Sequence, residues 1–262
     1  MPSHSSSTNS VEKACRVLTA LTDPRNATLT RIAAVTGIHK VSVLRVLQTL
    51  VQEKLVERLP DSTEYRYGLA MYAIASALQS RLGLAAAAAP SLRRLAERSG
   101  DTVLLVVRSG LECICVARET GNYPIHASTL HLGSRRPLGV GSGPMAVLSW
   151  LDAQEQAAAL QYLASQERIY PNFTAAYVMR MVKETQDGGC AILYDSVLSQ
   201  VGGIGMAILH AQGRPVGAIS ISSLSSRIRE REDFLRSLLA REVSLVSREL
   251  APGALTPGPH AS

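Results

Sequence analysis

The chain has 262 residues and a formal net charge of +6, and 46% of its residues are hydrophobic while 18% are charged. This length suits one large domain or two ordinary ones. No apolar run reaches the roughly 18–20 residues that cross a bilayer, and the N-terminus lacks the pattern of a secretory signal. We therefore expect a cytoplasmic protein. Its four cysteines are too few and too irregularly spaced for a disulfide framework.

Positive charge is concentrated near the N-terminus. Residues 1–82 carry ten basic and six acidic side chains, so under a third of the chain holds two thirds of its net charge. This bias permits contacts with nucleic-acid phosphates without establishing them, because charge of this size also serves solubility alone.

Three short helices are predicted in this basic region. Apolar residues at helical spacing predict the first, which runs from Val11 to the break at Asp23-Pro24. Residues 31–36 predict a second helix, and Gly37 supplies a tight turn before the third, over residues 39–54. The apolar residues expected on the inner face of the third helix are Val43, Val46, Leu47 and Leu50.

A hairpin is predicted directly after these helices. Residues 55–59 and 65–70 have the pattern of two strands, joined by a turn over residues 60–63. Three helices followed by a two-stranded wing form the plan of a winged helix-turn-helix, whose third helix lies in the major groove of DNA. The predicted DNA-contacting residues are Lys40, Ser42, Arg45, Thr49 and, on the wing, Arg66. The alternative is an ordinary small helical subdomain with a solvated polar face.

The second half of the chain has a different character. Residues 71–100 are rich in alanine and leucine and predict a nearly continuous helix that kinks or restarts at Pro90. Its apolar residues fall on more than one side, so we expect a partner chain. Strands are predicted over residues 102–110, 111–119, 190–195, 202–210 and 215–223, and helices near residues 144–151, 153–165, 173–187 and 229–249. Hairpin pairs interleaved with helices imply an α+β domain on an antiparallel sheet.

Residues 31–70 resemble the DNA-binding domain of the isocitrate lyase regulator (IclR) family of bacterial transcription factors. The residues that match the family's motifs are Thr36, Gly37, Ile38, Lys40, Ser42, Val43, Arg45, Thr49, Leu50, Tyr67, Gly68 and Leu69. Val41 and Leu44 depart from the commoner polar residues, so the family's base preference does not transfer. The resemblance implies a winged helix-turn-helix, a linker helix and a GAF-like α+β effector domain with an antiparallel sheet.

On this basis the chain has five predicted parts. They are a disordered tail (1–9), the winged helix-turn-helix domain (10–70), the linker helix (71–83), the effector-binding domain (84–250) and a second disordered tail (251–262).

A second resemblance to the family begins at Gly133, in GSRRPLGVGSGPMAVLSWL. The matching residues are Gly133, Arg135, Pro137, Leu138, Gly143, Ala146 and Leu148. The glycine loop over residues 139–144 lets backbone N–H groups approach a small anion, and Pro144 suits the first turn of the helix that follows. Such a helix start is a reasonable carboxylate site, although the alternative is a purely structural turn.

A third resemblance covers residues 202–223, GGIGMAILHAQGRPVGAISISS. Strand alternation puts Ser220 and Ser222 on one face, where they would orient a ligand unless they merely face solvent. The resemblance places Asp195 at an acidic pocket position, and Gly203 where some members carry a cysteine, which predicts a roomier or differently shaped cavity. The predicted ligand-contacting residues are Gly141, Gly143, Met145, Asp195, Gly203, Ile204, Ser220 and Ser222.

The resemblance implies a ligand-responsive regulator of transcription that binds operator DNA sequence-specifically and requires no cofactor. It also implies a homodimer, or a pair of dimers, and the helix start and glycine loop favour a small organic acid as effector. One alternative is a protein–protein interaction module with a vestigial pocket.

The other alternative is an enzyme that uses Asp195 or one of His126, His131 and His210. Against it, the sequence has no nucleophile elbow, P-loop, dinucleotide fingerprint or metal-ligand spacing. Cys113 and Cys115 would share one face of a strand as half of a metal site, but no Cys or His partners lie near them in the sequence.

Overall fold

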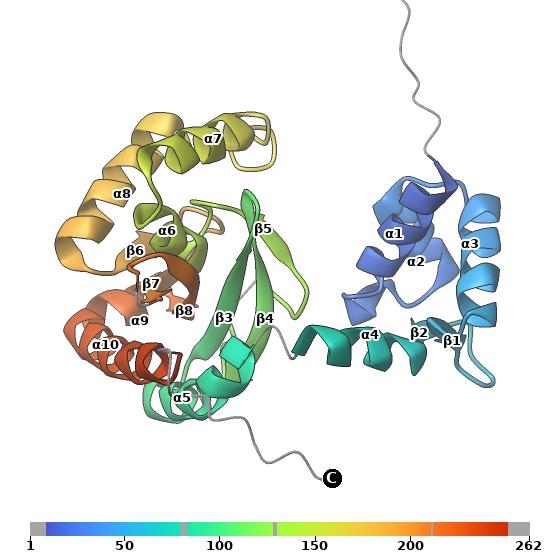
Figure 1. Ribbon diagram of the computed structural model, residues 1–262, viewed down its shortest axis with the longest axis horizontal. Helices are drawn as coiled ribbons and strands as arrows, with labels where there is room; N and C mark the ends of the chain where they lie inside the picture. The colour runs from blue at the N-terminus through green and yellow to red at the C-terminus, as the bar shows by residue number, and fades with distance from the viewer. Residues whose placement is uncertain (1–8, 80–82, 128–129, 211, 251–262) are drawn as a thin grey trace, which may run out of the picture. The chain divides into compact units, whose positions relative to one another are not determined.

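The computed structural model describes residues 9–79, 83–127, 130–210 and 212–250 (Figure 1). The chain divides into two compact units, residues 1–82 and 83–262. The two predicted tails, apart from Asn9, lie outside the described residues. In the described part of the chain, no helix is both long enough and apolar enough to cross a membrane.

The first unit is a winged helix-turn-helix, as predicted. Its elements are α1 (Ser10–Ala20), the 3-10 helix η1 (Pro24–Asn26), α2 (Leu29–Thr36), α3 (Lys40–Gln52), β1 (Val56–Arg58), β2 (Tyr65–Tyr67) and α4 (Ala70–Gln79). Strands β1 and β2 pair antiparallel to form the wing. Thr28 caps α2 by accepting from the Arg31 amide, and Gly37 ends it in a left-handed conformation that favours glycine (φ 66°). This sharp turn sets the direction of α3.

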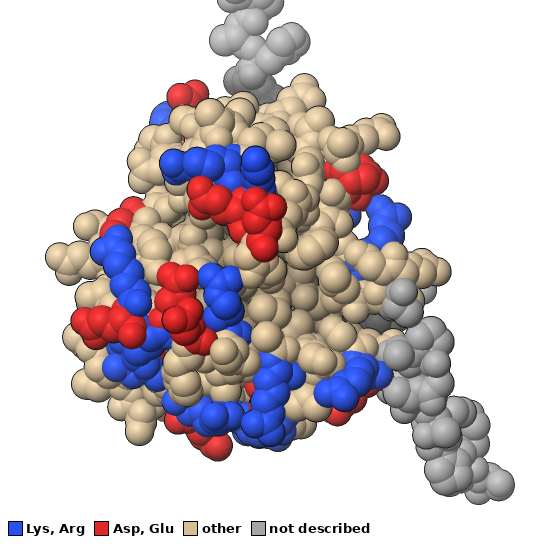
Figure 2. Space-filling view, turned by 90° about the vertical axis from the view of Figure 1, so that its left-hand side faces the viewer, with Lys and Arg blue, Asp and Glu red and all other residues tan. Residues whose placement is uncertain are grey.

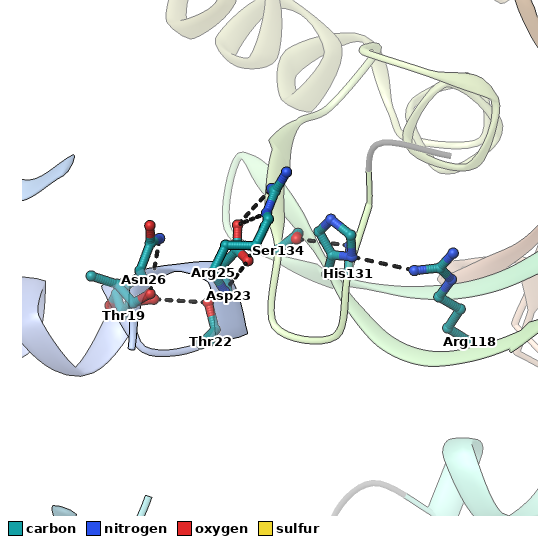
Figure 3. A network of polar contacts seen from close by, with 9 residues as sticks. Thr19, Thr22, Asp23, Arg25, Asn26, Arg118, His131 and Ser134 are labelled. Carbon is teal, nitrogen blue, oxygen red and sulfur yellow. Dashed lines mark hydrogen bonds and ion pairs between the residues drawn. The ribbon is translucent and has the colours of Figure 1, made fainter. Parts of the chain in front are cut away.

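The turn after α1 is held by its own polar side chains, which Figure 3 shows. The Asp23 carboxylate accepts from the Arg25 amide and pairs with its guanidinium at 2.6 Å. The Asn26 side chain donates to the Ala20 carbonyl, and the Thr22 hydroxyl donates to the Thr19 carbonyl. These contacts satisfy the end of α1 before the chain enters α2.

The second unit is an α+β domain on a six-stranded sheet in the order β5-β4-β3-β8-β7-β6. Its elements are α5 (Gly83–Ser99), β3 (Thr102–Ser109), β4 (Glu112–Thr120), β5 (Arg135–Pro137), α6 (Ser142–Ser149), α7 (Ala153–Ala164), α8 (Ala175–Gly188), β6 (Ala191–Tyr194), β7 (Val201–Leu209), β8 (Pro215–Leu224), α9 (Ser225–Glu230) and α10 (Glu232–Glu249). Every neighbouring pair of strands is antiparallel, which confirms the predicted sheet type.

Helices cover both faces of this sheet (Figure 1). Because successive strand residues point to opposite faces, Ile219 and Ile221 of β8 pack into a core with α5 and α10. Ser220 of the same strand faces α6, whose Met145 belongs to a second core with α8. The two cores leave a small polar space where α6 begins.

Three predictions about helices are corrected. Residues 71–100 form two helices, α4 and α5, and residues 80–82 between them lie outside the described part. Helix α5 continues through Pro90, so of the predicted kink or restart the restart does not occur. The last predicted helix is broken at Arg231 into α9 and α10, and the short strand β5 was not expected.

Charged side chains of the second unit are mixed on the face that carries α8 and α10. Figure 2 shows basic and acidic groups next to one another there, and the ion pairs Arg236–Glu232 and Arg180–Glu184 are among the contacts of α8 and α10. On this face, therefore, no single sign of charge gathers into a patch.

Candidate functional site

The two faces of α3 differ sharply in exposure. Val43, Leu47 and Leu50 are buried in the core of the first unit. The opposite face consists of residues at i, i+3, i+4 and i+7, which we call the outer stripe: Val41, Leu44, Arg45 and Gln48, all exposed. Two of these are apolar: Val41 is 54% exposed and Leu44 is 37% exposed.

The predicted contact residues lie around this stripe. Lys40 is exposed in the first turn of α3, and Arg45 belongs to the stripe itself. Ser42 is only half-buried at one side, and the Thr49 hydroxyl donates to the Arg45 carbonyl within the helix at 3.2 Å. The sequence-based list omitted Val41, Leu44 and Gln48, although their spacing opposite the core residues identifies them.

Contacts from outside the helix fix the position of α3. The Arg16 guanidinium donates to the Thr36 carbonyl at the end of α2, and the Tyr67 hydroxyl donates to the Leu18 carbonyl at 2.6 Å. The first bond ties α1 to the turn before α3, and the second ties the wing to α1. The elements around α3 are thus joined to one another by hydrogen bonds.

Arg66 on the wing is already paired. Its guanidinium contacts the Glu57 carboxylate directly across the strand pair, where the two residues are in register. The Arg66 side chain stays 63% exposed. A DNA phosphate would therefore have to compete with Glu57 for this cation, which the sequence did not indicate.

A cavity of about 50 Å³ lies where α6 begins, against β7 and β8. Its lining residues are Leu104, Leu130, Arg136, Gly141, Ser142, Gly143, Pro144, Leu193, Ser196, Val197, Leu198, Val201, Gly202, Gly203, Ser220 and Ser222. Five of the predicted ligand-contacting residues are among them: Gly141, Gly143, Gly203, Ser220 and Ser222.

The first turn of α6 supplies polar groups to this cavity. Gly141 precedes it at φ 89°, and no side chain caps the helix. The amides of Ser142 and Gly143 have no acceptor in the described part of the chain, and Pro144 has no amide hydrogen. Two N–H groups and the positive end of the helix dipole are therefore available to an anion.

Glycines in β7 let α6 approach the sheet this closely. A Cβ atom at Gly205 would lie 2.5 Å from the Ser142 carbonyl oxygen, and one at Gly203 would lie 2.6 Å from the Ser142 hydroxyl. The space beside Gly203 is thus filled by Ser142. Gly203 therefore serves close packing of the helix on the strand, and it adds no room to the cavity at this point.

Ser220 and Ser222 do not have the equivalent roles that alternation suggested. Ser220 is 3% exposed, and its hydroxyl has no partner in the described part of the chain. The Ser222 hydroxyl donates to the Ala127 carbonyl at 2.5 Å, so its proton is already committed. Of the two, Ser220 is the hydroxyl that can donate to a ligand.

Arg136 is a cavity residue that sequence reasoning missed. Because β5 alternates, Arg135 points outward and pairs with Glu112 at 2.7 Å, while Arg136 lines the cavity. Burial lowers the pKa of the Arg136 guanidinium, and Tyr170 and Cys115 oppose that effect. An arginine remains charged under such a shift, so the cavity contains a cation. A strand of three residues is too short to show periodicity in the sequence.

Three predicted ligand contacts fall outside the cavity lining. Met145 is fully buried in the core beneath α6 and does not reach the cavity. Ile204 points to the other face of the sheet, into the core with α10, because its neighbours Gly203 and Gly205 take the cavity face. Asp195 turns toward α9, where it accepts from the Ser225 hydroxyl at 2.8 Å and lies 3.6 Å from Arg229.

Cys113, Cys115 and His131, which were considered for metal binding or acid–base chemistry, are engaged in packing or hydrogen bonding. Burial raises the pKa of Cys113 to about 12 and that of Cys115 to about 11. Arg118 lies 3.2 Å from Nδ1 of His131 (Figure 3), and since an arginine only donates, this nitrogen accepts. In the described ranges, no group of three or more His, Cys, Asp or Glu side chains is arranged to hold a metal ion.

Curated proteins of similar sequence are regulators of transcription. The chain is 24% identical over 245 residues to the HTH-type transcriptional regulator KipR of Bacillus subtilis, covering 92% of this chain and 96% of that protein. It is 23% identical over 230 residues to the HTH-type transcriptional regulator XynR of Escherichia coli, covering 85% and 89%.

Solved structures share the fold over nearly the whole chain. An IclR transcriptional regulator from Alicyclobacillus acidocaldarius matches with a TM-score of 0.73 at 23% identity, covering 91% of this chain and 97% of that one. An IclR homologue from Microbacterium hydrocarbonoxydans, complexed with 4-hydroxybenzoate, matches with a TM-score of 0.74 at 18% identity, covering 92% and 99%.

Two family profiles match the sequence itself. The profile described as IclR helix-turn-helix domain matches residues 10–60, and that described as Bacterial transcriptional regulator IclR C-terminal matches residues 76–248. The second alone covers more than half of the chain. The protein therefore belongs to the IclR family of bacterial transcriptional regulators.

Proposed function

We propose that the protein controls transcription in the cytoplasm by binding operator DNA through α3, in response to a small organic acid bound at α6. The effector class is argued from three groups that line one cavity: a partly buried cation, a free hydroxyl and uncapped helix amides. Arg136, Ser220 and the first turn of α6 supply these groups. Together they match a carboxylate, which accepts several hydrogen bonds and carries the opposite charge.

The size of the cavity limits the effector. Ligand sites for drug-sized molecules have volumes of roughly 300–1,000 Å³, whereas this cavity has about 50 Å³. In this conformation it accepts an acid with few heavy atoms, and a larger acid requires the surrounding loops to move. Most of the remaining lining is apolar, including Leu104, Leu193 and Val201, and suits a short hydrocarbon part. The relative from Microbacterium hydrocarbonoxydans contains an acid of related chemistry.

The effector proposal is tested by calorimetry on the full chain with a panel of small monocarboxylic acids and their primary amides. The acids should bind and the uncharged amides should not, because only the acids pair with Arg136. Arg136→Gln should weaken binding of the best acid by about thirtyfold or more, as expected when one partner of a buried charged pair is removed. Arg135→Gln is the matched control, because Arg135 lies in the same strand but points outward.

Two outcomes contradict this proposal. If the amides bind as tightly as the acids, recognition of the carboxylate charge is excluded. It is also excluded if Arg136→Gln binds the best acid with unchanged affinity. For regulation, the bound acid must also change operator affinity, which requires it to bind the two DNA-affinity states unequally.

A homodimer is the proposed binding state, supported by the exposed apolar surface around α4. Leu69 is 87% exposed, Tyr72 is 71% exposed and Ile74 is 58% exposed. A surface of this kind usually marks an interaction site, and two DNA-binding units give a half-site pair that multiplies specificity. The double variant Tyr72→Glu, Ile74→Glu should sediment as a monomer at micromolar concentration, whereas the unchanged chain should not. An unchanged chain that sediments as a monomer contradicts the proposal.

A further inference from the structure

The outer stripe of α3 combines two exposed apolar side chains with two that form directional hydrogen bonds. Val41 and Leu44 lie one helical turn apart, on the same face as Arg45 and Gln48. Neither apolar residue contributes to the core of the first unit, which the opposite face of the helix fills. Their exposure is therefore not explained by folding.

Each member of the stripe has a known match on a base edge in the major groove. Arginine pairs with guanine O6 and N7, glutamine pairs with adenine N6 and N7, and an apolar side chain contacts the C5-methyl group of thymine. Val41 and Leu44 lie in the N-terminal half of α3, the part of a recognition helix that reaches base edges.

We propose that Val41 and Leu44 read thymine methyl groups, so that each operator half-site has a thymine opposite this pair, beside the bases read by Arg45 and Gln48. This inference rests on the proposed DNA contact of α3 and adds the class of base that it selects. The polar residues Ser42 and Thr49 lie at the sides of the stripe. Ser42 is half-buried, and the Thr49 hydroxyl already donates to the Arg45 carbonyl, so both side chains are less available to a base edge.

The surroundings of the pair favour DNA over a protein partner. Lys40 and Arg45 flank Val41 and Leu44 and are exposed, and no acidic residue occurs between positions 40 and 52. A basic helix face with a small apolar centre complements the polyanionic edge of a groove that presents a methyl group. An interface with another protein is instead usually depleted of charge at its centre.

The test replaces thymine by uracil in the operator, which removes the C5-methyl group and leaves every hydrogen-bonding group unchanged. The operator is first mapped by footprinting the full chain on the promoter region beside its gene. Each thymine of a half-site is then replaced singly, and affinity is measured by fluorescence anisotropy. We expect one or two positions per half-site at which uracil weakens binding by roughly threefold to fivefold, the effect of one lost methyl contact.

Protein variants assign this effect to the two side chains. Val41→Ala and Leu44→Ala should each reduce the difference in affinity between thymine and uracil operators at the position that the shortened side chain contacted, because most of its contact with the methyl group is lost. Both residues are exposed and alanine is the better helix former, so neither variant should unfold the helix. Val35→Ala is the matched control, because Val35 is 55% exposed on α2 and should leave the thymine preference intact.

The outcomes separate this inference from the function on which it rests. If Arg45→Ala keeps full operator affinity, the assignment of α3 as the reading helix fails and the methyl contact fails with it. If Arg45→Ala loses affinity but uracil has no effect at any position, DNA reading stands and methyl recognition is overturned. A uracil effect that persists unchanged in both alanine variants overturns it as well.

Discussion

The outer stripe of α3 and the cavity at α6 are built in opposite ways. The stripe belongs to one continuous helix, and its members are four exposed side chains at regular spacing. The cavity is assembled from β3, β5, α6, β6, β7, β8 and loops, and its polar groups are mostly enclosed. One surface is accessible to a large polyanion, and the other holds at most a few heavy atoms.

This difference shows how each site obtains selectivity. In the proposed role, the stripe would select by the order of its side chains along a groove, so a change at one position would alter one base preference and leave the fold intact. The cavity selects by enclosure, because glycines bring a helix start against a sheet and leave room for little else. Changes at these glycines therefore affect ligand binding and stability together.

The largest effect is expected where the cavity depends on close packing. Gly205→Ala puts a methyl group 2.5 Å from the Ser142 carbonyl, so α6 must shift from β7. We expect a loss of about 2–3 kcal/mol in the free energy of unfolding, as for overpacked cores. Chemical denaturation followed by circular dichroism measures it. Gly83→Ala is the control, because nothing lies within 4 Å of a Cβ atom there. Equal stability of the two variants would contradict the close-packing explanation.

A smaller effect, on recognition alone, is expected at the stripe. Arg45→Ala should lower the preference for operator over unrelated DNA by about 1–3 kcal/mol, since one bidentate base contact is removed. Stability should stay unchanged, because Arg45 is exposed. Competition binding assays at fixed salt provide the measurement. Arg45→Lys should recover affinity for both DNAs but not the preference, because lysine lacks the planar fork. Full preference in the lysine variant would show that Arg45 contacts phosphate only.

The two serines of β8 sharpen the contrast within the cavity itself. Ser222→Ala removes the bond to the Ala127 carbonyl and should cost about 1 kcal/mol of stability. Ser220→Ala breaks no bond within the described residues, so it should leave stability unchanged and weaken binding of the organic acid by roughly fivefold. Thermal unfolding and calorimetry on both variants separate the two roles. If Ser222→Ala weakens acid binding and Ser220→Ala lowers stability instead, Ser222 is the serine that contacts the ligand.

The smallest effect is expected on the wing. Arg66→Ala should weaken binding to all DNA sequences alike and reduce the salt dependence by about one ion. Because Glu57 pairs with Arg66, Glu57→Gln should strengthen binding to all sequences by a similar, small factor. Stability should not change, since this ion pair is exposed. Salt titrations of both variants test the competition, and it is excluded if Glu57→Gln binds no more tightly.

Local patterns in the sequence were sufficient for the buried face of α3 and for the strand faces. Val43, Leu47 and Leu50 recur at helical spacing, so their burial also defines the exposed side of α3. The alternation of Ile219, Ser220 and Ile221 assigned each to a sheet face in the same way. The family motifs added the order of the two units. What these patterns did not give was Val41 and Leu44 as candidates, because polar side chains were favoured.

Only the tertiary structure decided which groups the cavity contains. Arg136 lines the cavity because β5 pairs with β4 in the register that sets Arg136 opposite Cys113. The Ser222 hydroxyl is already hydrogen-bonded because the Ala127 carbonyl lies within reach of β8. Ser142 meets Gly203 and Gly205 across some sixty residues of sequence. Periodicity in a sequence reports which face of a single element is apolar. A cavity is the space that several elements leave between them, and its contents depend on contacts that no one element encodes.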